Sequence, residues 1–228
     1  MTMSLTEFQV KFYEVKNLGW VQSLRRGPTG VGHTLEQLIG LEENNIAAPD
    51  LGTVELKGHR LNSSSMITLF TFNKKAWKMP PLEAVRKYGT VDASGRTGLY
   101  YTMSPNPNGA GLYLNIGEEI VSVRHIHGTV VAEWDLHEVA NKFLQKMPDL
   151  LLASAFSEDR GGHEWFLYDR ARLLEGTSAD ILKNQIREGN VLLDLRLHDQ
   201  GTRARNHGTG FRAREKNLTL LFKKVRDI

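Results

Sequence analysis

The stretch from Asp50 to Lys57 reads DLGTVELK and predicts a strand that carries charged side chains on one face. Val54 and Leu56 alternate with Glu55 and Lys57, which is the period of a half-buried strand. If Asp50 lies at the start of the strand, two carboxylates and one lysine can meet. Carboxylate oxygens suit Mg²⁺, and a lysine beside them can orient a water and offset phosphate charge. One interpretation of the stretch is therefore a site for metal-assisted hydrolysis of a phosphate ester.

The spacing of these three residues does not by itself distinguish a site from an exposed strand face. A chain of 228 residues is expected to contain about one Asp…Glu-x-Lys match by chance. The context adds further groups. Glu36 falls on a short helix after a glycine-rich loop and offers a third carboxylate. Arg25 and Arg26 flank that loop and could hold phosphates.

The elements around this strand alternate between helices and strands without an internal repeat. This mixed order predicts an α+β fold with a largely antiparallel sheet. We expect a long irregular connection over residues 91–110, which are rich in Gly, Pro, Asn and Ser. The expected helices span residues 5–17, 34–39, 82–88, 135–146, 179–188 and 215–226. The expected strands span residues 51–57, 65–72, 112–116, 119–126, 129–134, 150–156, 164–173 and 191–197.

The composition is that of a globular chain, with 40% hydrophobic and 24% charged residues in 228. This length predicts one domain, or two lobes that share a core. We expect no membrane helix, because no apolar run approaches about 18 residues, and no signal peptide. The absence of cysteine excludes disulfides, thiolate metal sites and thiol nucleophiles. A cytoplasmic location is expected.

The charge is unevenly distributed along the chain. Residues 196–228 hold nine basic and three acidic groups, a balance of +6, so residues 1–195 carry 20 basic against 23 acidic groups. Such a block suits a polyanion, although a solvated C-terminal helix is the alternative. Within the block, residues 198–210 combine Arg203, Arg205, Asn206 and His207 with three glycines. This composition favours a segment that contacts bases and phosphates.

Several motifs together resemble the MvaI/BcnI restriction endonucleases, in the MutH-like branch of the PD-(D/E)xK nucleases. They are TGVGHTLE at residues 29–36, EENNIAAPD at 42–50, ELK at 55–57, LFT at 69–71, DLR at 194–196 and HGTGFR at 207–212. These motifs follow the order of the family from about Gly19 to Arg212. This collinearity is far more specific than the nuclease motif alone.

The resemblance implies a PD-(D/E)xK nuclease core and two lobes that clamp duplex DNA. The whole chain, residues 1–228, would be one endonuclease domain, with a catalytic lobe at about 1–95 and a recognition lobe at about 96–228. It implies a monomeric type II restriction enzyme that needs Mg²⁺ and nicks each strand in turn at a CC-N-GG-like site. Mn²⁺ would substitute for Mg²⁺, whereas Ca²⁺ would bind without turnover. A companion DNA methyltransferase is expected in the host.

The resemblance also assigns roles to individual residues. Asp50 and Glu55 would bind the metal ion, Lys57 would position the attacking water, and Glu36 would support them. His207 and Arg212 match the base-reading segment. The full set of expected DNA-binding residues is Arg25, Arg26, His33, Lys74, Arg196, Arg203, Arg205, Asn206, His207 and Arg212.

Other readings stay open. His125 and His127 alternate on a strand and could share a metal ion, but an exposed strand face explains them more simply. Trp77 and Trp134 are expected in the core rather than stacked on bases. A repair nickase of the MutH type and a DNA-binding protein of this fold that does not cut are the alternative functions.

Overall fold

A computed structural model of the chain describes residues 3–41, 49–73 and 75–228. The chain forms two compact units. The first unit contains Met1–Ile67, Leu144–Thr177 and Leu218–Ile228, and the second contains Thr68–Phe143 and Ser178–Asn217. The chain thus passes between the two units at residues 67–68, 143–144, 177–178 and 217–218. The lobe boundary expected after residue 95 would require the chain to pass between the units only once.

Two helices of the first unit form where the sequence predicts them. Helix α1 (Leu5–Asn17) begins at Ser4, whose hydroxyl accepts a hydrogen bond from the Glu7 amide at 3.2 Å, while the Glu7 carboxylate accepts one from the Ser4 amide at 2.7 Å. Helix α2 (Gly30–Ile39) begins four residues before the expected position. It ends as expected at Gly40, which adopts a φ of 74°.

The sheet of the first unit has the strand order β1-β10-β9-β2, and β14 also pairs with β10. These strands are β1 (Trp20–Gln22), β2 (Val54–Arg60), β9 (Asp149–Arg160), β10 (His163–Glu175) and β14 (Lys224–Asp227). Strands β2 and β9 run parallel, which places Glu55 opposite Leu150 and Lys57 opposite Leu152. The other pairs in this sheet are antiparallel.

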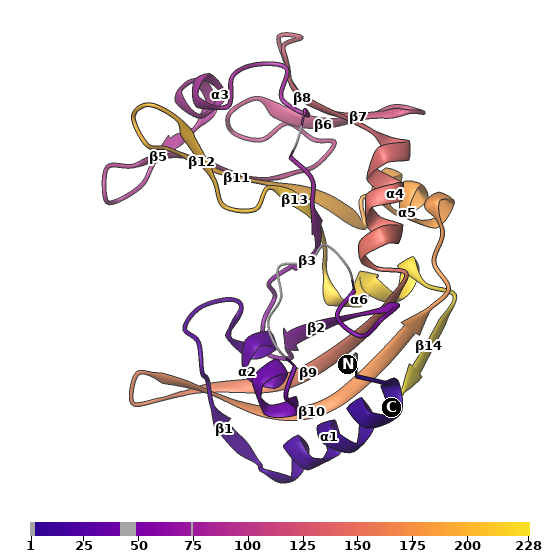
Figure 1. Cartoon of the computed structure of the whole chain (residues 1–228). Helices are drawn as coiled ribbons and strands as arrows, with labels where there is room; N and C mark the ends of the chain where they lie inside the picture. Colours follow the sequence, from indigo (N-terminus) through magenta and orange to yellow (C-terminus); the bar gives the residue numbers. More distant parts are fainter. Residues whose placement is uncertain (1–2, 42–48, 74) are drawn as a thin grey trace. The chain divides into compact units, whose positions relative to one another are not determined.

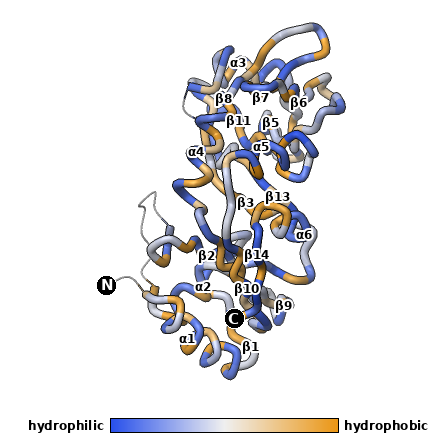
Figure 2. Tube along the Cα trace, turned by 90° about the vertical axis from the view of Figure 1, so that its right-hand side faces the viewer, coloured by the Kyte–Doolittle hydropathy of each residue, from blue (hydrophilic) through white to orange (hydrophobic). Residues whose placement is uncertain are grey.

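The core of the first unit lies between its sheet and its two helices. Phe8 and Phe12 of α1 pack in one cluster with Leu35 of α2 and Leu56 of β2. Figure 1 shows both helices beside the long strands β9 and β10, and Figure 2 shows hydrophobic and hydrophilic residues alternating along α1. Helix α2 lies very close to β2 at a pair of glycines, because a Cβ atom at Gly58 would lie only 2.7 Å from the Gly32 nitrogen.

The second unit contains two sheets. The larger sheet has the order β3-β13-β11-β5-β4, with β12 also paired to β11, and the smaller has the order β6-β7-β8. Its strands are β3 (Ile67–Thr71), β4 (Thr90–Val91), β5 (Thr97–Met103), β6 (Leu112–Ile116), β7 (Ile120–His125), β8 (Val130–Asp135), β11 (Val191–Asp199), β12 (Ala204–Asn206) and β13 (Gly210–Ala213). The helices are α3 (Pro81–Tyr88), α4 (Leu136–Lys146, whose last turn belongs to the first unit) and α5 (Ala179–Arg187). The expected meander over residues 112–134 is confirmed, as are the α+β class and the largely antiparallel pairing.

Trp134 packs in the core of the second unit as the sequence predicts, whereas Trp77 is only half-buried. Trp134 is 2% exposed, and its indole nitrogen donates a hydrogen bond to the Phe72 carbonyl at 2.6 Å. Its ring meets that of Phe211 edge-on. His125 and His127 do not alternate along one strand, because β7 ends at His125 and His127 lies in the turn that follows. The centroids of their two rings are 4.8 Å apart, and the His125 ring stacks on Tyr88 at 5.1 Å. None of the helices in the described part of the chain has the length and apolar character needed to cross a bilayer.

Two expectations about local structure are wrong. Residues 91–110 are not wholly irregular, because β4 ends at Val91 and β5 spans Thr97–Met103 between β4 and β11. The run TGLYYTM is rich in β-branched and aromatic residues, and its pairing with β11 outweighs the turn-forming residues around it. Residues 215–226 do not form one helix. Helix α6 (Glu215–Leu218) and a 3₁₀ turn (Thr219–Leu221) are followed by β14, which pairs with β10.

Candidate active site

The three residues of the nuclease motif meet on β2. Glu55 is 1% exposed, and its Oε1 atom is ion-paired with the Lys57 ammonium on the same face of the strand. The Asp50 carboxylate lies beside the strand, because its Oδ2 atom accepts a hydrogen bond from the Leu56 amide at 3.0 Å. The tight turn from Leu51 to Val54 brings Asp50 back along β2.

A second lysine completes this group, and the sequence analysis misses it. Lys146, the last residue of α4, places its ammonium 2.8 Å from Glu55 Oε2. The parallel pairing of β2 with β9 explains the approach, because β9 begins at Asp149 opposite Val54. The only signal in the sequence is a basic residue in the last turn of a helix that precedes a buried strand.

The charge state of Glu55 reflects competing influences. Burial raises the pKa of Glu55, and the nearby Asp50 charge acts in the same direction. Lys57 and Lys146 oppose this rise, but they do not cancel it. Burial thus outweighs the two ammonium groups, and the metal-free fold disfavours the ionised form of Glu55.

The same group of residues fits a divalent cation. Glu55 Oε2 is buried and accepts no well-aligned hydrogen bond from the described residues, although the Lys146 ammonium lies near it. Within residues 3–41, 49–73 and 75–228, no cluster of three or more His, Asp or Glu side chains could hold a metal ion. Two carboxylates are nevertheless enough for Mg²⁺, which keeps several of its waters when it binds protein.

Glu36 and His33 lie on α2, the helix packed against β2. Both side chains are half-buried. A Cβ atom at Gly32 would lie 3.7 Å from Glu36 Oε1, so the carboxylate folds back along its own helix. The Glu36 charge also contributes to the raised pKa of Tyr168, whose main cause is burial. Glu36 is thus part of the first unit near the catalytic strand.

In the second unit, a buried carboxylate holds two arginines that the sequence analysis assigns to DNA. Asp194 is 1% exposed, and its Oδ2 atom lies 2.6 Å from Arg196 Nε and 3.0 Å from Arg212 Nε. The Thr102 hydroxyl donates a hydrogen bond to Asp194 Oδ1 at 2.9 Å. Burial lowers the pKa of Arg212, and the attraction of Asp194 opposes this shift. The pair of guanidinium groups is held on neighbouring strands β11 and β13.

His207 lies beside this pair of strands, in the turn between β12 and β13, and forms a second polar cluster. Its Nε2 atom is 2.6 Å from His198 Nδ1, and the Tyr100 hydroxyl is 3.3 Å from the same His198 atom. Burial lowers the pKa of His207, and the charges of His198, Arg205 and Arg96 lower it further. His198 and Tyr100 are functional candidates that the sequence analysis does not identify.

The remaining predicted residues are placed as follows. Asn206 closes the turn after β12, because its Oδ1 atom accepts hydrogen bonds from the Gly208 and Thr209 amides at 2.9 and 2.8 Å. Arg203 and Arg205 are exposed. Arg25 is half-buried and Arg26 is exposed. Lys74 lies outside the described residues, as do residues 42–48 of the family motif.

A family model and solved structures both relate the chain to the same group of restriction endonucleases. The model of the MvaI/BcnI restriction endonuclease family matches residues 9–222. A solved complex of the restriction endonuclease MvaI with cognate DNA is similar at 25% identity and a TM-score of 0.80, covering 99% of each chain. MvaI solved without DNA is similar at 25% identity and a TM-score of 0.53, covering 100% of this chain and 98% of that one. No curated protein sequence matches the chain.

Proposed function

Because the chain belongs to the MvaI/BcnI restriction endonuclease family, we propose that it cleaves duplex DNA at one short sequence with Mg²⁺ as the metal ion. Membership of this family makes the chain a type II site-specific deoxyribonuclease. The observation that carries the finer proposal is the meeting of Asp50, Glu55 and Lys57 on β2. The enzyme is proposed to act as a monomer that nicks each strand in turn at a C/G-rich site of the CC-N-GG type.

The chemistry follows from the position of each side chain. Asp50 and Glu55 would hold the metal ion through their carboxylates. Bound Mg²⁺ supplies a Lewis acid for the scissile phosphate and lowers the pKa of a coordinated water. The Lys57 ammonium would orient the attacking water and offset charge on the phosphate. Lys146 would contact Glu55 from the end of α4, and Glu36 would support the site from α2.

Recognition is assigned to the second unit and catalysis to the first. Arg196 and Arg212 share the Asp194 carboxylate, which would keep both guanidinium groups in one orientation for the acceptors of a base edge. His207 would read a base from the neighbouring turn. The MvaI relative solved with cognate DNA supports duplex DNA as the partner.

Three further proposals concern the conditions in which the enzyme acts. Mn²⁺ is expected to replace Mg²⁺, and Ca²⁺ is expected to support DNA binding without cleavage. The enzyme would act in the cytoplasm. A companion DNA methyltransferase would protect the host genome without forming a stable subunit.

Digestion of a long unmethylated DNA with Mg²⁺ tests the proposed function. We expect discrete fragments whose sequenced ends share one short site. Cutting of a single strand would instead indicate a nickase of the MutH type, and binding without cutting would indicate a recognition protein.

A supercoiled plasmid with one site is expected to pass through an open-circle form before it becomes linear. The reason is that one active site per monomer can hydrolyse only one strand at a time. Gel analysis of a time course and sedimentation of the enzyme measure both properties. A stable dimer that converts supercoiled plasmid directly to linear DNA would contradict the proposed monomer.

The pH dependence of cleavage is expected to report the ionisation of Glu55. Metal binding needs the carboxylate, and the pKa of metal-free Glu55 is raised above its ordinary value of 4.5, so at Mg²⁺ concentrations far below saturation the acid limb of kcat/KM should lie above that pH. Lys146 lowers this pKa, and the variant Lys146→Met should therefore move the limb to higher pH. Lys142→Met, one turn earlier on α4, is the matched control and should leave the limb unchanged. An unshifted limb in Lys146→Met would refute the proposed influence of Lys146 on Glu55.

A further inference from the structure

Arg60, the last residue of β2, makes a fixed two-pronged contact with Glu164 of β10. Its Nε atom donates to Glu164 Oε1 at 2.6 Å and its Nη2 atom donates to Oε2 at 2.8 Å. The Arg60 side chain is 15% exposed, and its guanidinium lies over the Phe166 ring, 5.2 Å from the centroid. A paired, stacked arginine of this kind has little freedom to move.

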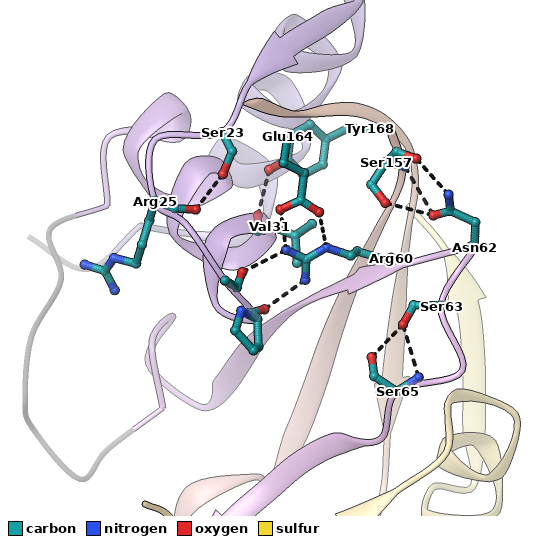
Figure 3. A network of polar contacts seen from close by, with 12 residues as sticks. Ser23, Arg25, Val31, Arg60, Asn62, Ser63, Ser65, Ser157, Glu164 and Tyr168 are labelled. Atoms are coloured by element: carbon teal, nitrogen blue, oxygen red, sulfur yellow. Dashed lines mark hydrogen bonds and ion pairs between the residues drawn. The ribbon is translucent and has the colours of Figure 1, made fainter. Parts of the chain in front are cut away.

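The other side of the same guanidinium binds the loop that precedes α2. Arg60 Nη1 donates to the Pro28 carbonyl at 2.9 Å, and Nη2 donates to the Gly27 carbonyl at 3.0 Å. Figure 3 shows these four hydrogen bonds converging on one guanidinium between Glu164 and the loop. Arg60 therefore joins two successive peptide units of the loop to the sheet.

The ends of this loop, residues 23–29, are fixed by further contacts. The Ser23 amide donates to the Glu164 carbonyl at 2.8 Å, and the Ser23 hydroxyl donates to the Arg25 carbonyl at 2.7 Å. After the loop, the Tyr168 hydroxyl donates to the Val31 carbonyl at 2.6 Å. Gly30 is required here, because a Cβ atom would lie only 2.5 Å from the Arg25 carbonyl oxygen and 2.8 Å from the Ser23 hydroxyl.

The backbone of the loop is held by these contacts, and the Arg25 side chain is half-buried. Figure 3 shows the Arg25 side chain directed away from the contacts around Arg60. Arg26 is exposed. Arg60 also lies on the same strand as Glu55 and Lys57, so one strand carries catalytic residues at one end and the loop anchor at the other.

We propose that Arg60, held by Glu164, is a positioning residue that sets the backbone of the 23–29 loop so that Arg25 and Arg26 grip DNA phosphates in register with the catalytic strand. The inference rests on the proposed function, because it takes duplex DNA as the ligand of the loop. A lysine at position 60 keeps the charge but cannot make the four hydrogen bonds of the guanidinium fork. Without them, the two arginines would have to be ordered each time DNA binds.

A double-mutant cycle on DNA affinity in Ca²⁺ tests the coupling between Arg60 and the loop. The pair Arg25→Ala with Arg26→Ala should weaken binding by on the order of 10- to 60-fold at about 0.1 M salt and flatten the slope of log Kd against log salt by about 2. Arg60→Lys should weaken binding by about tenfold and flatten the same slope, since disordered arginines make poor phosphate contacts. Added to the Arg25/Arg26 pair, Arg60→Lys should have almost no further effect on Kd.

Two other variants separate positioning from general stability. Glu164→Gln leaves Arg60 without its carboxylate and should give the same pattern as Arg60→Lys. Arg226→Lys makes the matched change in another Arg–Glu pair of the first unit, where Arg226 Nε lies 3.0 Å from Glu175, and should leave Kd unchanged. In Mg²⁺, Arg60→Lys should raise KM more than it lowers kcat, with melting temperatures recorded for all variants.

Three results would overturn the inference. The first is an effect of Arg60→Lys on the free energy of DNA binding that adds fully to the effect of the Arg25→Ala/Arg26→Ala double variant. The second is an Arg60→Lys enzyme with unchanged Kd and salt slope. The third is a double variant, Arg25→Ala with Arg26→Ala, that binds DNA as tightly as the parent chain does. In each case the fragment pattern of the Mg²⁺ digest still decides the proposed function, because that assay does not depend on the loop variants.

Discussion

Replacing Asp50 with Ala, or Glu55 with Gln, is expected to abolish DNA cleavage in Mg²⁺ while DNA binding in Ca²⁺ persists. Each carboxylate would hold the metal ion, and the loss of one ligand should cost on the order of 10³-fold or more in rate, or about 4 kcal/mol of transition-state stabilisation. Plasmid cleavage under single-turnover conditions measures the rate, and a gel-shift assay in Ca²⁺ measures binding.

The control for this experiment is Glu14→Ala, which removes an exposed carboxylate from α1 of the same unit. It should cut at the parental rate. Full cleavage by either Asp50→Ala or Glu55→Gln would show that the metal is held elsewhere.

Unfolding can be separated from loss of catalysis in the Glu55→Gln variant. The pKa of Glu55 is raised in the folded state, so the metal-free fold disfavours the ionised form. Stability should therefore fall as pH rises from 4.5 through the raised pKa, and then remain level. A neutral glutamine avoids this cost. Metal-free Glu55→Gln should therefore melt no lower than the parent chain at neutral pH.

The parts of the fold that depend on local signals are predictable from the sequence. Helix α1 follows from its cap at Ser4 and its periodic apolar residues, and it spans Leu5–Asn17 as expected. The alternation around Glu55 and Lys57 predicts their shared strand face, which the Lys57–Glu55 ion pair confirms. In these regions the period of the sequence and the tertiary contacts favour the same structure.

The features that the sequence does not predict depend on contacts between distant residues. Lys146 reaches Glu55 only because β9 pairs in parallel with β2, and that register is not visible in either segment. Strand β5 gains its stability from pairing with β11, which follows it by some ninety residues. Strand β14 likewise forms by pairing with β10, which overrides the helical pattern expected for residues 215–226. Arg60 gives no sequence signal of its role, because its partners lie in the 23–29 loop and in β10.

The segment from residue 203 to residue 212 is expected to read bases rather than only grip phosphates. The Arg212 Nε atom is ion-paired with Asp194 and its Nη2 atom donates to the Gly208 carbonyl at 3.2 Å, so the guanidinium is fixed before any contact with a base. Burial, and secondarily the neighbouring Arg205 and Arg96, lower the pKa of His207, so the imidazole would act through hydrogen bonds rather than charge near pH 7. Arg205 is exposed beside it.

Single changes of Arg205, His207 and Arg212 to Ala, assayed on cognate DNA and DNA with one base changed, test base reading. A lost base contact should reduce discrimination by about 1–3 kcal/mol, which is roughly 5- to 150-fold in the ratio of the two affinities. A lost phosphate contact should instead weaken binding to both DNAs equally and flatten the slope of log Kd against log salt by about 1. Arg214→Ala is the matched control, since Arg214 is an exposed arginine two residues beyond this segment and should leave the ratio unchanged. If all three variants bind both DNAs more weakly by the same factor, this segment contacts phosphates only, and base recognition must be assigned to other residues. We expect the Arg212 variant to show the largest loss of discrimination, because Asp194 orients its guanidinium before DNA binds.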